Sequence, residues 1–99
     1  MKDAKLFAVI RTHGDAWQHS LPLEGQEKWD EHAAFMNSLK KDGFVVLGGP
    51  LDGTPDVLLV IRANSADEIV DRLRGDPWTT DLLRLSRITP WTLRLGSLP

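Results

Sequence analysis

The sequence predicts an α+β domain in which two helices cover one face of a four-stranded antiparallel sheet. Four short segments are rich in Val, Ile, Leu and Phe, and two segments between them space their apolar residues as helices do. The predicted order is β-α-β-β-α-β, which is the order of the ferredoxin-like arrangement. A chain of 99 residues is long enough for one such domain, so we assign residues 1–99 to a single core.

The first strand is predicted over residues 5–12, where the run KLFAVIRT is apolar and rich in strand-forming residues. Residues 14–25 contain two glycines and a proline and show no apolar period, which predicts a loop. The loop is long for a domain of this size, and long ordered loops often carry function.

The first helix is predicted over residues 26–42, because apolar spacing continues to Lys40 and Lys41 and a glycine follows at position 43. At about 100° per residue, His32 falls near the middle of the apolar sector rather than at its rim. The other members of this sector are Trp29, Ala33, Phe35, Met36 and Leu39. We therefore expect His32 to point toward the sheet.

His32 has two interpretations. It is either a core histidine with one hydrogen bond to a backbone carbonyl, or a group held for chemistry. Burial lowers the pKa of an imidazole, whereas a neighbouring carboxylate raises it. A neutral imidazole oriented by a carboxylate is a suitable general base near neutral pH, so the functional interpretation requires a carboxylate partner.

A hairpin is predicted in the middle of the chain. The runs FVVLGGPL (44–51) and VLLVIRA (57–63) read as strands, and DGTPD (52–56) between them has the composition of a turn. The glycines of LGGPL do not form a phosphate loop, because no helix with Lys and Ser or Thr follows. The two glycines, Gly48 and Gly49, are instead expected to let a ligand or another backbone approach closely beside His32.

The remaining elements have clear end signals. Ser65 and Glu68 form a capping box for a second helix, which Gly75 ends. Asp76 and Pro77 then suit the N-cap and first position of a short helical turn. The final strand is predicted over residues 84–95, and Pro90 within it favours an edge position.

The strands predict a partner for the second face of the sheet. When one face of a sheet is exposed to solvent, its strands alternate apolar and polar residues. The segments 6–10, 44–47 and 57–61 are instead apolar throughout. Two helices can cover only one face. We therefore expect a homodimer that packs sheet against sheet; the alternative is a monomer whose long loop folds over that face.

Composition narrows the classes of partner. The net charge of −2 gives no electrostatic case for nucleic acid or an anionic membrane. The chain has no cysteine, no apolar run near the ~18 residues of a membrane span, and no signal-peptide pattern at its start, so we expect a cytoplasmic protein. The three histidines lack metal-ligand spacing, so no metal site is expected.

Three stretches resemble the YCII-related (YciI-like) family. They are EHAAFMNSLKKDGFVVLGGPL (31–51), GDPW (75–78) and ITPWTL (88–93), and their order and spacing agree from about Lys5 to Gly96. The resemblance implies a dimeric α+β barrel of ferredoxin-like protomers and a pocket with a His–Asp pair, which carries over to His32 and Asp76. The associated chemistry is lyase-type or dehydrohalogenation on small oxygenated aromatics, without metal or organic cofactor.

The chain departs from the family pattern in two places. The loop over residues 13–26 is longer than usual, which would reshape the mouth of the pocket. The aromatic residue after Asp76-Pro77 is Trp78, where Phe or Tyr is commoner, which would change the pocket volume.

Each other candidate residue has a structural alternative. Asp76 can serve as an N-cap, and one carboxylate can both cap a turn and accept from a histidine. Arg11 can bind an anionic group of a substrate, or be solvated or ion-paired. Trp29 and Trp78 can line a pocket or simply pack the core and the dimer.

These observations favour a cofactor-independent lyase or isomerase acting on a small-molecule substrate. His32 would be the general acid and base, Asp76 would orient it, and Arg11, Trp29, Gly49, Pro50 and Trp78 would contact the substrate. The alternative is a non-catalytic small-ligand-binding or accessory homodimer on the same scaffold. A cofactor-free oxygenase of the wider barrel group rests on fold analogy alone.

Overall fold

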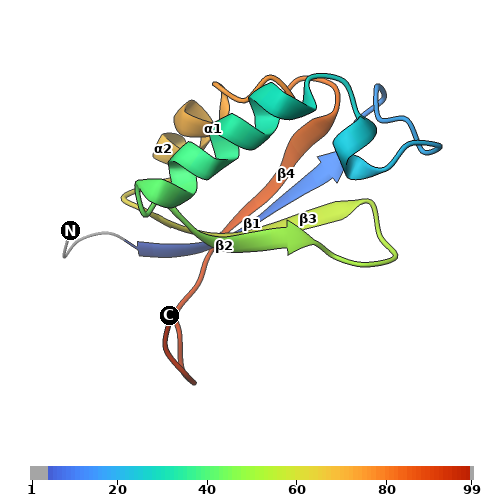
Figure 1. The fold of residues 1–99 in the computed structure, drawn as a ribbon. Coiled ribbons are helices and arrows are strands. Elements are labelled where there is room, and N and C mark those ends of the chain that lie inside the picture. The colour runs from blue at the N-terminus through green and yellow to red at the C-terminus, as the bar shows by residue number, and fades with distance from the viewer. Residues whose placement is uncertain (1–4, 99) are drawn as a thin grey trace.

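A computed structural model describes residues 5–98 and has the ferredoxin-like α+β fold that the sequence predicts. The elements are β1 (Lys5–His13), a short 3₁₀ helix (Leu23–Gly25), α1 (Trp29–Lys41), β2 (Val45–Pro50), β3 (Asp56–Ala63), α2 (Ala66–Leu73) and β4 (Leu83–Pro90). The strands form one antiparallel sheet in the order β2-β3-β1-β4. Both helices lie on the same side of this sheet (Figure 1).

The core lies between the helices and the two central strands. Phe7 pairs with Ile61 and Val9 with Leu59 across β1 and β3, so all four side chains share the face that the helices cover. The two helices and the edge strand β2 complete this core with Leu39, Ile69, Leu73 and Val45. At the next pair along the same face Arg11 lies opposite Val57, which places a buried cation at the end of the apolar core.

The first helix is shorter than predicted. It begins at Trp29 rather than at residue 26, because Lys28 adopts a left-handed conformation with φ of 60°. Its C-terminus is as predicted. Gly43 has φ of +81°, its N–H donates to the carbonyl of Lys40, and the next N–H donates to the carbonyl of Leu39. This pair of bonds is a Schellman motif, which requires the left-handed backbone that glycine adopts without strain.

The second helix confirms the predicted capping box. Ser65 Oγ accepts from the backbone N–H of Glu68 at 3.1 Å, and the Glu68 side chain returns to the N–H of Asn64 at 2.7 Å. Residues 76–82 form the predicted short helical segment as two successive turns, in which the N–H of Thr79 donates to the carbonyl of Asp76 and that of Leu82 to the carbonyl of Trp78, both at 3.1 Å. Asp76 caps them as expected, because its Oδ1 accepts from the N–H of Trp78 at 3.0 Å.

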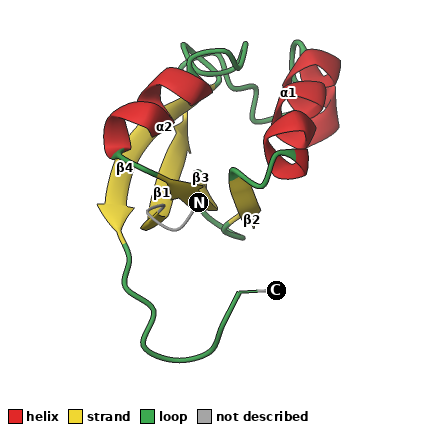
Figure 2. Cartoon of the chain, turned by 90° about the vertical axis from the view of Figure 1, so that its left-hand side faces the viewer, coloured by secondary structure: helices red, strands yellow, loops and turns green. Residues whose placement is uncertain are grey.

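The last strand ends earlier than predicted, at Pro90 rather than at residue 95. β4 is an edge strand, and a proline there removes a donor that would otherwise continue the ladder. One further bond joins the N–H of Trp91 to the carbonyl of Leu6 at 2.9 Å. Residues 92–98 then leave the sheet on the side opposite to the helices (Figures 1 and 2).

Candidate active site: a histidine–aspartate pair beside a tryptophan-lined cavity

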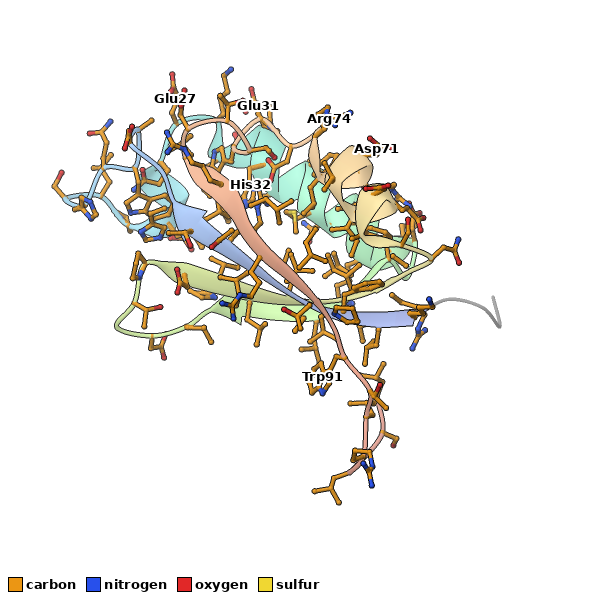
Figure 3. The ribbon with its side chains drawn as sticks, turned by 180° about the vertical axis from the view of Figure 1, so that it is seen from behind. Glu27, Glu31, His32, Asp71, Arg74 and Trp91 are labelled. Atoms are coloured by element: carbon orange, nitrogen blue, oxygen red, sulfur yellow. The ribbon has the colours of Figure 1, made fainter. Side chains whose placement is uncertain are left out.

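His32 and Asp76 meet although 44 residues separate them. His32 is in the first turn of α1, and Asp76 follows the end of α2, so the packing of the two helices on the sheet brings the side chains together. His32 Nδ1 lies 2.9 Å from both carboxylate oxygens of Asp76. Figure 3 shows the His32 side chain on the inner side of α1, facing the sheet.

Three groups hold the Asp76 carboxylate. Besides His32 and the Trp78 N–H, Arg11 Nη1 donates to Oδ2 at 2.8 Å. Burial by itself would raise the pKa of the Asp76 carboxyl. The hydrogen bonds from His32, Trp78 and Arg11, together with the charge of Arg11, outweigh burial and hold this pKa below its ordinary value. Asp76 is therefore a carboxylate at neutral pH and accepts from His32.

Arg11 is completely buried and its donors are engaged by the protein. Its Nε and Nη2 donate to the carbonyl of Leu83 at 3.2 and 2.9 Å, and Nη2 also donates to Thr79 Oγ1 at 3.1 Å. Thr79 is fixed in turn, because its hydroxyl donates to the carbonyl of Leu73 at 2.6 Å. This geometry favours the ion-paired interpretation of Arg11 over direct binding of a substrate anion.

The second ring nitrogen of His32 is free. With Nδ1 facing a carboxylate, the neutral ring carries its proton on Nδ1 and presents a lone pair at Nε2. No hydrogen bond from residues 5–98 reaches Nε2, yet no buried side-chain nitrogen or oxygen in that range lacks a partner. Nε2 is therefore not sealed inside the protein and can meet a ligand.

His32 lines a cavity of about 520 Å³ whose walls are mainly apolar. Six of the seven residues that the sequence singles out line it: Arg11, Trp29, His32, Gly49, Pro50 and Trp78. The seventh, Asp76, does not line the cavity but bonds to three residues that do, His32, Arg11 and Trp78. Further apolar lining comes from Trp17, Leu23, Ala33, Met36, Val57, Leu59 and Leu83.

Aromatic contacts fix the orientation of the imidazole. The rings of His32 and Trp78 stack with centroids 3.7 Å apart and an interplanar angle of 6°. The ring centroid of Trp29 lies 5.9 Å from the ring centroids of both His32 and Trp78, with an interplanar angle of 45° in each case. Trp78 is itself held, because its indole N–H donates to the carbonyl of Glu27 at 2.6 Å. A histidine bounded in this way keeps its Nε2 in one direction, as a proton-transfer group must.

The long loop contributes more to the site than the sequence indicates. Trp17 and Leu23 come from it and line the cavity. Gln26 holds the loop in shape: its amide oxygen accepts from the N–H of Gln18 at 3.0 Å, and its amide nitrogen donates to the carbonyls of Gln18 and Leu21 at 2.8 and 3.2 Å. In the sequence, the single tryptophan in this polar loop was the one indication that the loop contributes to the site. The hydrogen bonds of the Gln26 side chain could not be predicted from neighbouring residues.

No three of the His, Asp and Glu side chains within residues 5–98 are grouped so that they could hold a metal ion. No helix in the same range is long and apolar enough to cross a membrane.

Comparison with known proteins adds no family assignment. No protein-family model matches the chain, and no curated protein matches its sequence. The resemblance to the YciI-like family therefore stays a prediction.

Proposed function

We propose that this protein is a cofactor-independent enzyme of lyase or isomerase type, with His32 as its general acid and base. The observation that carries the proposal is a buried His–Asp pair whose histidine keeps Nε2 free and lines a mainly apolar cavity of about 520 Å³. A cavity of this size accommodates a compact ligand of the kind that small-molecule enzymes bind.

The chemistry follows from the arrangement of charges. His32 Nε2 removes a proton from an acidic C–H bond of the substrate, and the electron pair of that bond forms a new double bond. In a lyase reaction the leaving group departs with its bonding pair. In an isomerisation an existing double bond of the substrate shifts, and its electron pair takes the proton back from the imidazolium at another carbon. Asp76 stabilises the imidazolium that forms transiently, and Arg11 keeps Asp76 ionised from behind.

The resemblance to the YciI-like family supports the same class of chemistry. The activity associated with that family is lyase-type or dehydrohalogenation chemistry on small oxygenated aromatics. Three tryptophans, Trp17, Trp29 and Trp78, border the cavity and suit a flat, partly apolar substrate. Trp78, at the position where the family commonly has a smaller aromatic residue, narrows the space next to His32.

The test is turnover of a panel of small hydroxylated and halogenated aromatics by wild-type protein and by His32→Gln. Loss of a general base lowers kcat by about 10²–10⁴-fold. His19→Gln is the matched control, because His19 is exposed and lies outside the cavity lining. Equal turnover by wild type and His32→Gln would remove His32 from the mechanism.

The alternative function is non-catalytic: a small-ligand-binding or accessory protein that uses the same cavity. The observation that favours it is the stacking of His32 on Trp78, which would serve a purely structural pair equally well. Saturable binding of panel compounds without turnover by the wild type would support this alternative over catalysis.

We also propose that the active form is a homodimer joined through the open face of the sheet. The register places a run of apolar side chains on the face that the helices leave uncovered: Leu6, Ala8, Ile10, Leu47, Leu58 and Val60. The long loop is not available to cover them, because its Trp17 and Leu23 line the cavity on the helix side. The tail after β4 extends on the same open side and presents Trp91 and Leu95, which are 44% and 90% exposed.

A further inference from the structure

A second histidine faces the cavity. His13 is the last residue of β1, pairs with Leu83 on β4, and lies two positions beyond Arg11 on the face that the helices cover. It lines the same cavity as His32. The mechanism described above makes no use of it.

The ring nitrogens of His13 are free. No side-chain hydrogen bond of His13 is formed with residues 5–98, and no buried side-chain nitrogen in that range lacks a partner. Its ring is nevertheless held in place, because it stacks on Trp17 with centroids 3.8 Å apart and an interplanar angle of 8°. His13 is thus an oriented imidazole with open hydrogen-bonding positions, as His32 is.

A continuous row of aromatic rings connects the two histidines along the cavity wall. His13 stacks on Trp17, Trp17 meets Trp78 edge to face at 5.7 Å, and Trp78 stacks on His32. The wall is therefore apolar in its middle and carries an imidazole at each end. A wall of this form matches a molecule with the same distribution of polarity.

We propose that the ligand of this cavity carries two hydrogen-bonding groups separated by an apolar centre, and that His13 binds one of them while His32 binds the other. This inference rests on one part of the proposed function, namely that the cavity binds a ligand and that Nε2 of His32 faces this ligand. It adds a specificity-determining residue and restricts the substrate class to molecules that are polar at both ends.

The surroundings of His13 suit this role. Burial and the nearby His19 lower the pKa of His13, while the Asp56 carboxylate raises it to a lesser extent, so that the pKa lies below its ordinary value of 6.5. At pH 7 the ring is accordingly neutral and both donates and accepts hydrogen bonds. It can meet a carbonyl, a hydroxyl or an ether oxygen without requiring a charged ligand.

The experiment compares two probes that share a phenol hydroxyl but differ at the opposite end: 4-hydroxyacetophenone and 4-isopropylphenol. Dissociation constants at pH 7 come from NMR shifts of the indole N–H signals of Trp17, Trp29 and Trp78, with Trp91, which lies outside the lining, as reference. We measure how much more tightly each protein binds the ketone than the isopropyl compound. His13→Phe keeps a ring to stack on Trp17 and removes the two nitrogens.

In His13→Phe, the ratio of the affinity for the ketone to that for the isopropyl compound should fall about fivefold. This change corresponds to the loss of one hydrogen bond of about 1 kcal/mol. Affinity for 4-isopropylphenol should stay within about twofold, and unchanged circular dichroism shows that the variant is folded. An unchanged preference in His13→Phe, or no saturable binding of either probe to wild type, would overturn the proposal.

This outcome is separate from that of the turnover test. The binding experiment requires no reaction, so loss of the preference in His13→Phe would stand even if His32→Gln retained full turnover. Conversely, His32-dependent turnover together with an unchanged preference in His13→Phe would leave the proposed function in place and remove only the role of His13.

Discussion

Asp76 shows how one residue can combine a structural and a functional role. Its Oδ1 caps the turn that follows α2, and both oxygens face His32 Nδ1. The sequence suggested the cap from the Asp-Pro pair alone. The ion pair with Arg11 came from elsewhere in the chain and had no local signal, because strand position does not reveal which buried group will oppose an arginine.

The lowered pKa of Asp76 predicts a dependence of stability on pH. As the pH falls below the ordinary aspartate value of 3.8, the unfolded chain takes up a proton at this position before the folded protein does. The unfolding free energy that the folded carboxylate contributes is therefore present above about pH 4 and is lost as the pH falls through the folded pKa. Urea titrations over this range measure the loss.

Asp76→Asn is the variant that tests this dependence. It should be less stable than wild type at neutral pH, by about 3–5 kcal/mol, because Arg11 is left buried without its counter-charge. Its unfolding free energy should also fall less steeply in acid. Asp71→Asn is the control, since Asp71 is exposed and, among residues 5–98, forms an ion pair only with the exposed Arg74. An acid dependence of Asp76→Asn as steep as that of wild type would contradict the assignment.

At the scale of elements, local chemistry explains where most boundaries lie. Gly43 and the Ser65–Glu68 capping box mark a helix end and a helix start that the structure confirms. The predicted start of α1 at residue 26 was wrong for two reasons. The Gln26 side chain is hydrogen-bonded to the loop, and Lys28 has a left-handed backbone conformation directly before the helix. The hydrogen bond between Gln26 and Gln18, eight residues apart, helps to set this boundary. The spacing of apolar residues carries no information about such a contact.

The two glycines of β2 differ in a way that is testable. A Cβ at position 48 would lie 2.5 Å from Leu59 Cδ2 and 3.0 Å from the carbonyl oxygen of Leu58, whereas a Cβ at position 49 would meet nothing within 4 Å. Overpacking of this kind costs about 1–3 kcal/mol. Gly48→Ala should therefore unfold at lower urea concentration than wild type.

Gly49→Ala is the matched variant on the opposite side of the same strand. Its unfolding free energy should equal or slightly exceed that of wild type, because alanine restricts the unfolded chain more than glycine does. Equal destabilisation by the two substitutions would show that strand flexibility, rather than the contact with Leu59, determines the requirement for glycine at position 48.

For the whole molecule, the proposed dimer gives a sharp prediction. Leu47 is 45% exposed and pairs with Val60 on the open face of the sheet, so Leu47→Glu places a charge within the proposed interface. The wild type should have the mass of a dimer by light scattering at micromolar concentration, and Leu47→Glu that of a monomer.

Val70→Glu provides the control for this experiment. Val70 is also a partly exposed apolar residue, but it belongs to α2 on the other side of the sheet. This variant should remain dimeric. A monomeric mass for wild type would contradict the interface, and dissociation by Val70→Glu would place the contact on the helices instead.

The sequence alone determined the fold class, the order of the elements and the inward direction of His32. These depend on periodicity, turn residues and caps, which act over a few neighbouring positions. Only the tertiary structure decided that Arg11 supports Asp76 from behind, that Trp17 reaches the cavity and that His13 lines the same cavity as His32. These three contacts join residues that are distant in the sequence. They form only when the strands and helices pack together, so no local pattern of residues can predict them.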